Sequence, residues 1–594
     1  MNDKLEEAQN DSKKCWKILN TVTNRTKVKD AIEPDMITQT KANEYNKFFA
    51  TIGVEIQKKL GIRIQTPQNE TENIHQAKFA FSAESPEAIE KLIDNIKIDV
   101  ATGEDNIGAR LIKDMKVTIS PVLAKIINSG YSCNIFPDCM KKAKIKVIHK
   151  KECTEEISNY RPISILPTLS KIFERSAVNQ IVNYLETNKI LSSCQHAYRR
   201  HHSTVTCLFE AVNYIYKFID DKKWTAVASL DLSKAFDSIS HQLMLKKLEK
   251  LGLSRNTTQW ISSYLTNRTQ VIKFKHFTSE EETIMSGVPQ GSILGPLLFL
   301  CFTNDLFEEF QEDCKIIAYA DDTQIIVTAR KIEQLKLKIE NVITTAQRWY
   351  KNNSMKNNIG KTEVIVFNTN QKIAINVIDE GKPVKIESKA NIKILGVILD
   401  SHLNWSNQVN AVKKKAFNIT RNIHKINNLL PMKHRIKLYN AIISPQFSYA
   451  DIIWGGCRQK EIKSLQSVQN FAAKSITGHR KYDSATNSLK QLNFINLEQR
   501  RKVHENVFTH KALLQQSTDN INNQYKEHNS TANTRYAAQK KLNIPKHKTT
   551  KFQRSPLYRT ITSWNAYPNF SFGKIKQHKA LLQKHLSGLN TATM

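Results

Sequence analysis

Residues 315–329 read KIIAYADDTQIIVTA, two short apolar runs on either side of a polar centre. This pattern predicts a β-hairpin with Asp321 and Asp322 at its turn. Residues 224–232, WTAVASLDL, form a run of small and β-branched apolar residues. Such a run predicts a buried strand, with Asp231 at its end. Where these strands are neighbours in one sheet, the three carboxylates lie together.

Three converging carboxylates can hold two divalent metal ions about 3.5–4 Å apart, the arrangement that nucleotidyl transfer uses. Oxygen ligands of this kind favour Mg²⁺, which keeps several waters and takes substrate phosphates as further ligands. An Asp pair at a turn is also ordinary turn chemistry. The pair by itself is therefore consistent with a metal site or with a structural turn.

The segment between the two acidic sites is GVPQGSILGPLLF, residues 287–299. Gly287 and Gly291 allow the backbone to approach closely where a side chain would block it. A turn around Pro289 explains the two glycines but leaves Gln290 unexplained.

The chain is strongly basic. Of its 594 residues, 88 are Lys or Arg and 55 are Asp or Glu, which gives a formal net charge of +33. An excess of this size favours a polyanionic partner, because basic side chains neutralise phosphates and release counterions. A solvated basic surface without a partner and an anionic membrane surface are weaker alternatives.

Composition divides the chain into four parts. Residues 1–100 are polar and rich in Asn and Lys, and we expect them to form a connector with little core of its own. Residues 101–405 carry mixed α/β patterns, and residues 406–480 have a helical pattern broken at Pro445. Residues 481–594 form a basic region.

This C-terminal region has 19 Lys and Arg against five Asp and Glu, with no acid after Glu527. Several aromatic residues are interleaved with the basic ones. Phosphate contact combined with stacking on unpaired bases would use this mixture. A disordered tail has the same composition. The aromatic residues are Tyr525, Tyr536, Phe552, Tyr558, Trp564, Tyr567 and Phe570.

Targeting and metal signals are weak. The start, MNDKLEEAQNDSKKCW, is polar with early acids and does not resemble a secretory leader. The longest apolar run, residues 297–302, is too short to span a bilayer. Nine scattered cysteines without C-x-x-C or clustered His give no zinc site and predict reduced thiols. We expect an intracellular protein of the cytoplasm and nucleus, with no membrane partner.

Seven segments in order resemble the sequence blocks of reverse transcriptases, specifically those of non-LTR retrotransposons of the jockey-like and related kinds. The resemblance covers residues 101–405, with weaker similarity nearly to the end. The segments are NYRPISILPTLSKIFE (159–174), QHAYRRHHST (195–204), SLDLSKAFD (229–237), GVPQGSILGPLLF (287–299), YADDTQ (319–324), NNIGKTEVIVF (357–367) and IKILGVILD (392–400).

The resemblance implies a right-hand polymerase in the α/β class. Fingers and an α+β palm would occupy residues 101–405, a helical thumb 406–480, and a basic nucleic-acid-binding extension 481–594. The implied enzyme is an RNA-directed DNA polymerase, a nucleotidyltransferase that extends a DNA 3′ end on an RNA template. Its cofactor would be two Mg²⁺ ions, with Mn²⁺ as an alternative. Its partners would be template RNA, primer or target DNA, and deoxynucleoside triphosphates.

By the same resemblance, Asp231, Asp321 and Asp322 are the catalytic metal ligands, and the carbonyl of Leu232 is a further metal ligand. Phe236 would lie under the incoming sugar, where its ring would exclude a 2′-hydroxyl. A core aromatic at the start of a helix is the structural alternative for this ring. Asp237, the next residue, is expected only to cap the helix.

Other positions of the resemblance face the nucleotide. Gln290 would touch the incoming nucleotide and the template, and Gly291 belongs to the same nucleotide-binding segment. Arg161 and Arg199 would bind the triphosphate with planar, charge-assisted contacts, with Arg200 as an alternative to Arg199.

Two further sites come from the resemblance. Lys361 would lie near the pyrophosphate, where it could protonate or neutralise the leaving group. Leu395 and Gly396 would support the primer end. Solvated surface side chains are the alternative for the basic residues, and a short buried strand is the alternative for the segment around Leu395.

The sequence also departs from the family. About 130 residues precede the first finger block without a constellation suited to cutting DNA, so we expect no nicking domain and a separate endonuclease as a partner. Two alternatives to this function remain open. One is a maturase-type polymerase or an RNA-dependent RNA polymerase, and the other is a catalytically inactive, basic RNA-binding remnant of a decayed element.

Overall fold

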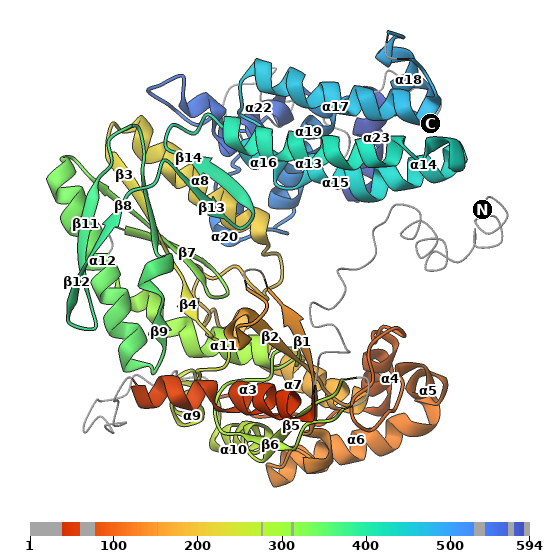
Figure 1. Ribbon diagram of the computed structural model, residues 1–594, viewed down its shortest axis with the longest axis vertical. Coiled ribbons are helices and arrows are strands. Elements are labelled where there is room, and N and C mark those ends of the chain that lie inside the picture. The colour runs from red at the N-terminus through yellow and green to blue at the C-terminus, as the bar shows by residue number, and fades with distance from the viewer. Residues whose placement is uncertain are drawn as a thin grey trace.

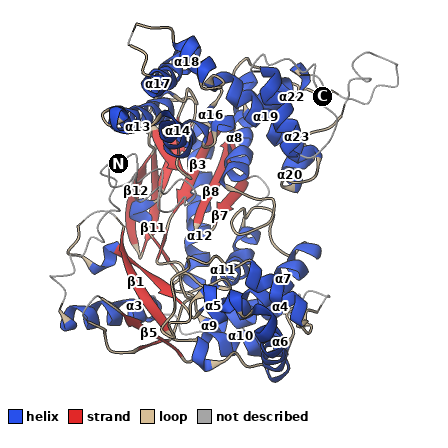
Figure 2. Cartoon of the chain, turned by 90° about the vertical axis from the view of Figure 1, so that its right-hand side faces the viewer, coloured by secondary structure: helices blue, strands red, loops and turns tan. Residues whose placement is uncertain are grey.

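The computed structural model describes residues 38–59, 78–150, 153–274, 277–310, 314–480, 482–527, 541–567 and 575–586. Two four-stranded sheets lie in separate parts of the molecule, and helices cover both. The part nearer the N-terminus contains the first sheet, and a middle part contains the second. The C-terminal helices pack against the end of the middle part that is remote from the first sheet (Figures 1 and 2). This mixed arrangement confirms the predicted α/β class.

The middle sheet, which we call the palm sheet, has the strand order β10-β3-β8-β7. All its neighbouring strands are antiparallel. The predicted hairpin forms two of them and the predicted buried strand forms a third. The strands are β3 (Trp224–Leu230), β7 (Cys314–Tyr319), β8 (Asp322–Ala329) and β10 (Glu363–Val366).

Both faces of the palm sheet are buried, which explains why its strands are mostly apolar. Ala226 and Ala228 pack into a core with α11 (Gly295–Thr303) and α12 (Ile332–Asn352). Val227, between them, points to the opposite core, which contains α8 (Thr204–Asp220). Alternate side chains of a strand point to opposite faces, so one short run serves two cores.

The first sheet, which we call the fingers sheet, has the order β2-β1-β5-β6. Helices lie around this sheet (Figure 1), and their buried residues belong to the core beneath the palm sheet, whereas the sheet itself has a smaller core of its own. The strands are β1 (Ala143–His149), β2 (Tyr160–Ile165), β5 (Arg268–Ile272) and β6 (Glu282–Ile284). The helices are α4 (Pro86–Asp94), α5 (Ala109–Asp114), α6 (Lys116–Cys133), α7 (Thr168–Thr187), α9 (His241–Lys250) and α10 (Arg255–Leu265).

Helix α3 (Gln39–Lys59) lies inside the range that we expected to be a connector, yet it packs on the fingers sheet. Its Tyr45 and Phe49 share a core with β1 and β2. The buried Asn46 donates from Nδ2 to the carbonyl of Gln270 at 3.1 Å, and Gln270 donates back to Asn46 Oδ1 at 3.0 Å. Helix α3 thus shares the core of the fingers sheet, and the expected division of the chain into four parts stays a prediction. The rest of residues 1–77 lies outside the described residues, apart from Thr38.

Beyond the palm sheet, two short hairpins lead to a group of helices. The hairpins are β11 (Ala374–Asp379) with β12 (Lys382–Glu387), and β13 (Asn391–Ile394) with β14 (Val397–Asp400). Two further strands of two residues each, β4 (Leu232–Ser233) and β9 (Lys356–Asn357), pair with each other. The helices are α13 (Ser406–His424), α14 (Met432–Leu438), α15 (Ser444–Ser448), α16 (Asp451–Trp454) and α17 (Gln459–Thr477). The expected break at Pro445 is a π-helical turn, residues Tyr439–Ile443, just before it.

The C-terminal helices join the same core as helices α13 to α17 and α8. Trp564 is 4% exposed, Tyr525 is 5% exposed and Phe552 is 8% exposed. These three rings therefore cannot stack on bases as we expected, because the fold already buries them. Tyr536 and Phe570 lie outside the described residues. The helices are α18 (Ala485–Gln491), α19 (Leu497–Leu513), α20 (Asp519–Asn522), α22 (Pro556–Ala566) and α23 (Ile575–Leu586).

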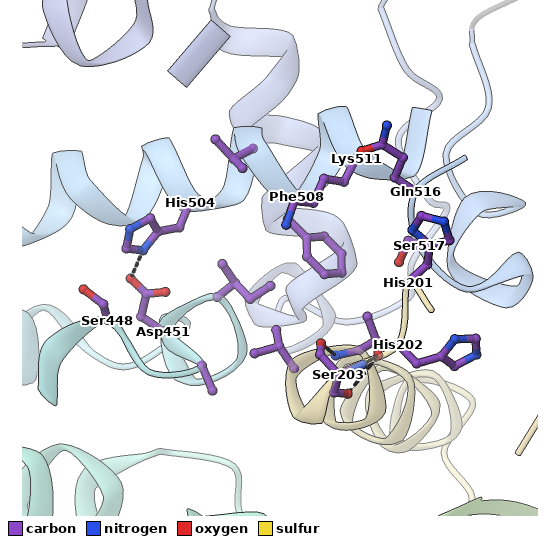
Figure 3. Close-up of a pocket in the computed structure, with 15 residues that line it drawn as sticks. His201, His202, Ser203, Ser448, Asp451, His504, Phe508, Lys511, Gln516 and Ser517 are labelled. Carbon is purple, nitrogen blue, oxygen red and sulfur yellow. Dashed lines mark hydrogen bonds and ion pairs between the residues drawn. The ribbon is translucent and has the colours of Figure 1, made fainter. Parts of the chain in front are cut away.

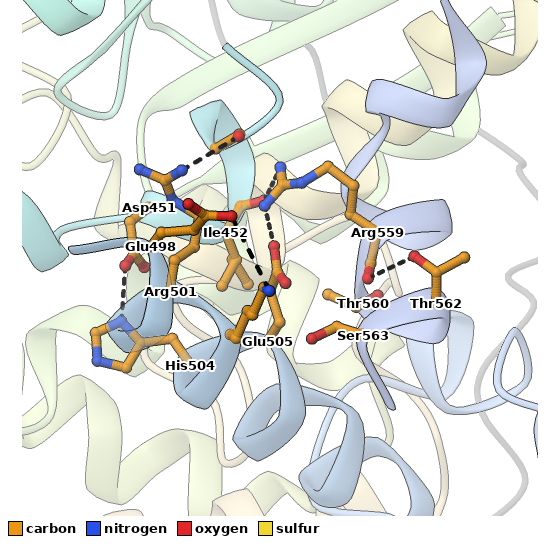
Figure 4. Close-up of polar contacts among 12 residues, drawn as sticks. Asp451, Ile452, Glu498, Arg501, His504, Glu505, Arg559, Thr560, Thr562 and Ser563 are labelled. Atoms are coloured by element: carbon orange, nitrogen blue, oxygen red, sulfur yellow. Dashed lines mark hydrogen bonds and ion pairs between the residues drawn. The ribbon is translucent and has the colours of Figure 1, made fainter. Parts of the chain in front are cut away.

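Some basic residues of this region also have structural partners (Figure 4). Arg559 forms an ion pair with Glu505 and donates to the carbonyl of Ile452 at 3.2 Å. His504 contacts Asp451 at 2.7 Å. Part of the positive charge in residues 481–594 thus joins α19 and α22 to α16 and is not free for phosphate binding.

Candidate active site

The palm sheet brings the three predicted acids together. The last paired residues of β3 and β8 are Leu230 and Thr323, and both acids lie one residue further along. Asp231 and Asp322 therefore lie at neighbouring strand ends, at the same edge of the sheet. Asp321 occupies the two-residue turn between β7 and β8. The same register explains why the acids meet although 90 residues separate them in sequence.

The acids interact electrostatically. Burial raises the pKa of Asp321, and the charge of Asp231 raises it further. Burial, Asp321 and Asp231 together raise the pKa of Asp322 to about 6. Like charges held together disfavour ionisation, and a bound cation would reverse this effect. Carboxylate oxygens that repel one another in this way suit a divalent ion such as Mg²⁺, whose charge would offset the repulsion.

Within the described residues, no three Asp, Glu, His or Cys side chains are grouped so that they alone could hold a metal ion. The acids would therefore supply only part of the ligands of a bound metal ion. A Mg²⁺ site of this type typically uses one or two carboxylates and completes its shell with water and substrate phosphates.

Basic side chains surround the acids. Arg161, on β2, lowers the pKa values of both Asp321 and Asp322. Burial lowers the pKa of Lys150, at the end of β1, and the charges of Arg161 and Lys361 lower it further. Arg161 and Lys361 are thus brought to the site. Lys150 was missed in the sequence, because a lysine at the end of a strand looks like any surface lysine.

Two contacts tie Asp231 and its neighbours to other parts of the site. The amide of Asn358 donates to the carbonyl of Asp231 at 3.0 Å, which places the turn carrying Lys361 beside this acid. Lys234 donates from Nζ to the carbonyls of Ser158 and Tyr160 at 3.2 and 3.3 Å. The fingers sheet is thereby linked directly to the segment after Asp231. Leu232, whose carbonyl is an expected metal ligand, lies in β4 beside Asn357.

Both glycines of the 287–299 segment are required by close backbone contacts. Gly287 has φ +79°, and a Cβ there would lie 2.7 Å from the carbonyl oxygen of Asp237. Gly291 has φ +121°, and a Cβ there would lie 2.6 Å from the carbonyl oxygen of Ser164 on β2. The expectation of close backbone approach at both positions is confirmed. The backbone thus joins the segment to Asp237 on one side and to the fingers on the other.

Gln290 has a partner that the sequence did not indicate. Its Nε2 donates to Asp237 Oδ1 at 2.7 Å, and its carbonyl accepts from the amide of Ser164 at 2.7 Å. Asp237 was expected only to cap a helix, and the cap of α9 is Ser240 instead. Asp237 therefore orients Gln290. Whether Gln290 also touches the nucleotide stays a prediction.

Burial raises the pKa of Asp237 to about 6, although Gln290 and Lys234 lower it. In the unfolded chain an Asp has a pKa near 4. The folded protein therefore binds more protons than the unfolded chain between about pH 4 and pH 6, and its free energy of unfolding falls as the pH rises through this window. Asp237→Asn keeps an acceptor for Gln290 and removes the charge.

We expect Asp237→Asn to be more stable than the wild type at pH 7.5, by up to about 3 kcal/mol. The difference should shrink toward pH 4.5. Unfolding midpoints of the two proteins at these pH values measure it. A variant less stable than the wild type at pH 7.5 would show that the ionised carboxylate stabilises the fold.

The sequence allowed two interpretations of Phe236, a ring under the incoming sugar and an aromatic residue of the core. The environment of the side chain agrees in part with the second. Its ring stacks on Phe299 of α11, with centroids 4.6 Å apart and an interplanar angle of 17°. The side chain is only partly buried and packs against the edge of the core. The ring is thus held rigidly from one side. Its contact with the sugar stays a prediction.

Arg199 is occupied elsewhere. Its Nε and Nη2 form a bidentate ion pair with Glu186 at 2.8 Å each, and Nη1 donates to the carbonyl of Ser192 at 2.6 Å. The side chain is 8% exposed. The structure therefore does not offer this guanidinium to a triphosphate. Arg200, the alternative, is exposed.

Leu395 and Gly396 form the turn of the β13–β14 hairpin. The hydroxyl of Tyr449 donates to the carbonyl of Leu395 at 2.5 Å, and its ring lies 3.4 Å from where a Cβ on Gly396 would be. The turn thus rests on Tyr449, directly after α15. Its role at the primer end stays a prediction.

A cavity of about 500 Å³ lies between the start of α8, α16 and α19 (Figure 3). The Asp451–His504 pair, Phe508 and Lys511 line parts of it. None of the predicted site residues does. This cavity is separate from the acidic site. In the described ranges, no helix combines the length and apolar character that crossing a bilayer requires.

An antiparallel palm sheet with acids at one edge, and a fingers sheet linked to that edge, defines the class as a nucleic-acid polymerase domain. Residues 148–399 match the family model for reverse transcriptase (RNA-dependent DNA polymerase). The chain therefore contains a reverse transcriptase domain, and the family resemblance seen in the sequence is confirmed.

Similar proteins come from mobile elements. The chain is 28% identical over 418 residues to the RNA-directed DNA polymerase from mobile element jockey of Drosophila melanogaster, a match that covers 68% of this chain and 45% of the relative. It is 26% identical to the probable RNA-directed DNA polymerase from transposon BS of the same species, covering 71% of this chain and 48% of the relative. The chain thus spans about half the length of these relatives.

Proposed function

We propose that this chain is an RNA-directed DNA polymerase of a non-LTR retrotransposon, which extends a DNA 3′ end on an RNA template. The observation that carries the proposal is the meeting of Asp231, Asp321 and Asp322 at one edge of the palm sheet, with Lys150 and Arg161 beside them. The reverse transcriptase domain over the same residues supports it.

In this proposal the three carboxylates hold two Mg²⁺ ions. When bound, these ions lower the pKa of the primer hydroxyl and stabilise the charge that develops on the triphosphate. Arg161 and Lys150 neutralise and orient the triphosphate from the fingers side. Lys361 faces the leaving pyrophosphate, and its ammonium can supply a proton or a positive charge.

The remaining site residues select and align the substrates. Asp237 holds Gln290 so that its amide faces the nucleotide and the template. Phe236, fixed by Phe299, occupies the space beneath the sugar and rejects a 2′-hydroxyl. Gly291 keeps the backbone close to β2 at the nucleotide side. The partners are template RNA, primer or target DNA, and deoxynucleoside triphosphates.

Primer extension by the purified chain tests this function. We expect a DNA primer annealed to RNA to be extended with dNTPs when Mg²⁺ is present, and not when Mg²⁺ is chelated. RNA binding is measured in parallel. Binding of RNA without any extension, with Mg²⁺ or Mn²⁺, would favour the alternative of an inactive RNA-binding remnant.

A further inference from the structure

The turn that carries Asp321 is held by one side chain from outside the hairpin. The amide of Ala320 donates to Gln195 Oε1 at 2.9 Å, and Gln195 Nε2 donates to the carbonyl of Ala320 at 3.2 Å. Ala320 has φ +57°, a left-handed conformation that residues with a Cβ rarely adopt. One buried amide thus satisfies both backbone groups of the strained residue directly before Asp321.

Gln195 is itself fixed against the palm sheet. The amide of Ala318 donates to the carbonyl of Cys194, and the amide of His196 donates to the carbonyl of Ala318, both at 2.8 Å. Residues 194–196 therefore run beside β7 and continue the sheet. Gln195 is 3% exposed, so water cannot take over its contacts.

The Glu186–Arg199 ion pair explains why this loop keeps its position. Arg199 Nη1 donates to the carbonyls of Ser192 and Gln195, at 2.6 and 3.3 Å. Its other nitrogens are bound to the Glu186 carboxylate at the end of α7. A planar guanidinium bound on both sides fixes the loop relative to the helix.

We propose that Gln195 is a positioning residue that sets the direction of the Asp321 carboxylate, and that the Glu186–Arg199 pair holds Gln195 in place. This inference rests on the proposed role of Asp321 as a metal ligand. Without the amide, the strained turn relaxes and the Asp321 carboxylate moves away from Asp231. A shift of about 1 Å at a reacting centre can cost on the order of 10²-fold in rate.

Two variants test the proposal in the full chain. Gln195→Ala removes the amide, and Gln195→Glu keeps the size and the acceptor but loses the donor to Ala320. In primer extension we expect kcat to fall about 10- to 100-fold in both, with the KM for dNTP within about threefold of wild type. The Mg²⁺ concentration that gives half-maximal rate should rise, because one ligand is displaced.

The matched control is Gln469→Ala. Gln469 is a buried glutamine on α17 that donates to Tyr439 Oη at 3.1 Å and to the carbonyl of Ile495 at 3.0 Å, remote from the acids. Its loss should lower stability without changing the Mg²⁺ requirement. A Gln195 variant that behaves like Gln469→Ala would mean that Gln195 has only a structural role.

Amide hydrogen exchange of the hairpin gives a readout that does not depend on activity. The Ala320 amide, bound to Gln195 Oε1 in the wild type, should exchange faster in Gln195→Ala, which removes this acceptor. It should stay protected in Gln195→Glu, which keeps an acceptor, and in Gln469→Ala. An inactive wild type counts against the proposed function, whereas the exchange data still test the contact. Unchanged exchange of the Ala320 amide in Gln195→Ala overturns the inference, as does an unchanged Mg²⁺ requirement of both Gln195 variants in an active enzyme.

Discussion

Replacement of Asp321 and Asp322 together by Asn is expected to reduce dNTP incorporation on a primed RNA template by at least about 10³-fold. The amides cannot carry the negative charge that holds divalent ions, and loss of the ions removes several kcal/mol of transition-state stabilisation. The fold should survive, because both acids lie at the end of the hairpin, where their side chains are partly desolvated but still reach solvent. Removal of the mutual repulsion between the carboxylates favours the folded state. Primer extension measures the loss.

The matched control is Asp305→Asn. Asp305 pairs with Lys247 Nζ at 2.6 Å, outside the acidic site. Its loss should leave nucleotide incorporation within a few-fold of wild type. RNA binding by the Asp321 and Asp322 double variant should also remain close to wild type. Equal incorporation by the double variant and the wild type would exclude these acids as metal ligands.

Substitution of Phe236 by Ala is expected to give the second largest effect, on the choice between dNTP and NTP. The ring is fixed by its stack on Phe299, so it cannot move away from a 2′-hydroxyl without losing that contact. We expect the ratio of kcat/KM for dNTP over NTP to fall at least about tenfold, mainly through faster NTP use. Single-nucleotide incorporation with paired dNTP and NTP substrates measures this ratio.

Phe236→Tyr is the control, because it keeps the ring and its stacking on Phe299. Its selectivity should stay near that of the wild type. A Phe236→Ala variant that loses activity equally with both substrates would show that the ring acts only in packing. A wild type that already prefers NTP would favour the alternative of an RNA-dependent RNA polymerase.

The palm could be predicted from the sequence because its signals are local. Each strand is a short apolar run, and the Asp pair lies where the apolar runs of the hairpin are interrupted. The order of the blocks, including GVPQGS between the acids, then identified the family. Gly287 and Gly291 followed from a rule about backbone approach, and both contacts exist.

Contacts between distant parts of the chain could not be predicted in this way. Arg199 has the residue type of a phosphate ligand, but its partner Glu186 is set by the packing of α7 against the following loop. Lys150 was missed because its partners come from four other segments. The packing of α3 could not be predicted because its buried face contains the polar Asn46. The hydrogen-bond partners of Asn46, on β5 and at Glu280, are distant in sequence.

Composition misled us most in the C-terminal region. Aromatic residues between basic ones suggested a surface for unpaired bases, yet Trp564 and Tyr525 are buried. A core between helices needs aromatic side chains as much as a nucleic-acid surface does. Only the packing of α19 against α22 shows that these aromatic residues belong to a core and not to a nucleic-acid surface.

Template-directed addition of a single nucleotide tests the central claim most directly. Four primed RNA templates that differ only in the templating base are each incubated with the four dNTPs, one at a time, and Mg²⁺. We predict that the wild-type chain adds the complementary deoxynucleotide in each case, and that the Asp321 and Asp322 double variant adds none. Addition that ignores the templating base, or addition by both proteins alike, would contradict the account.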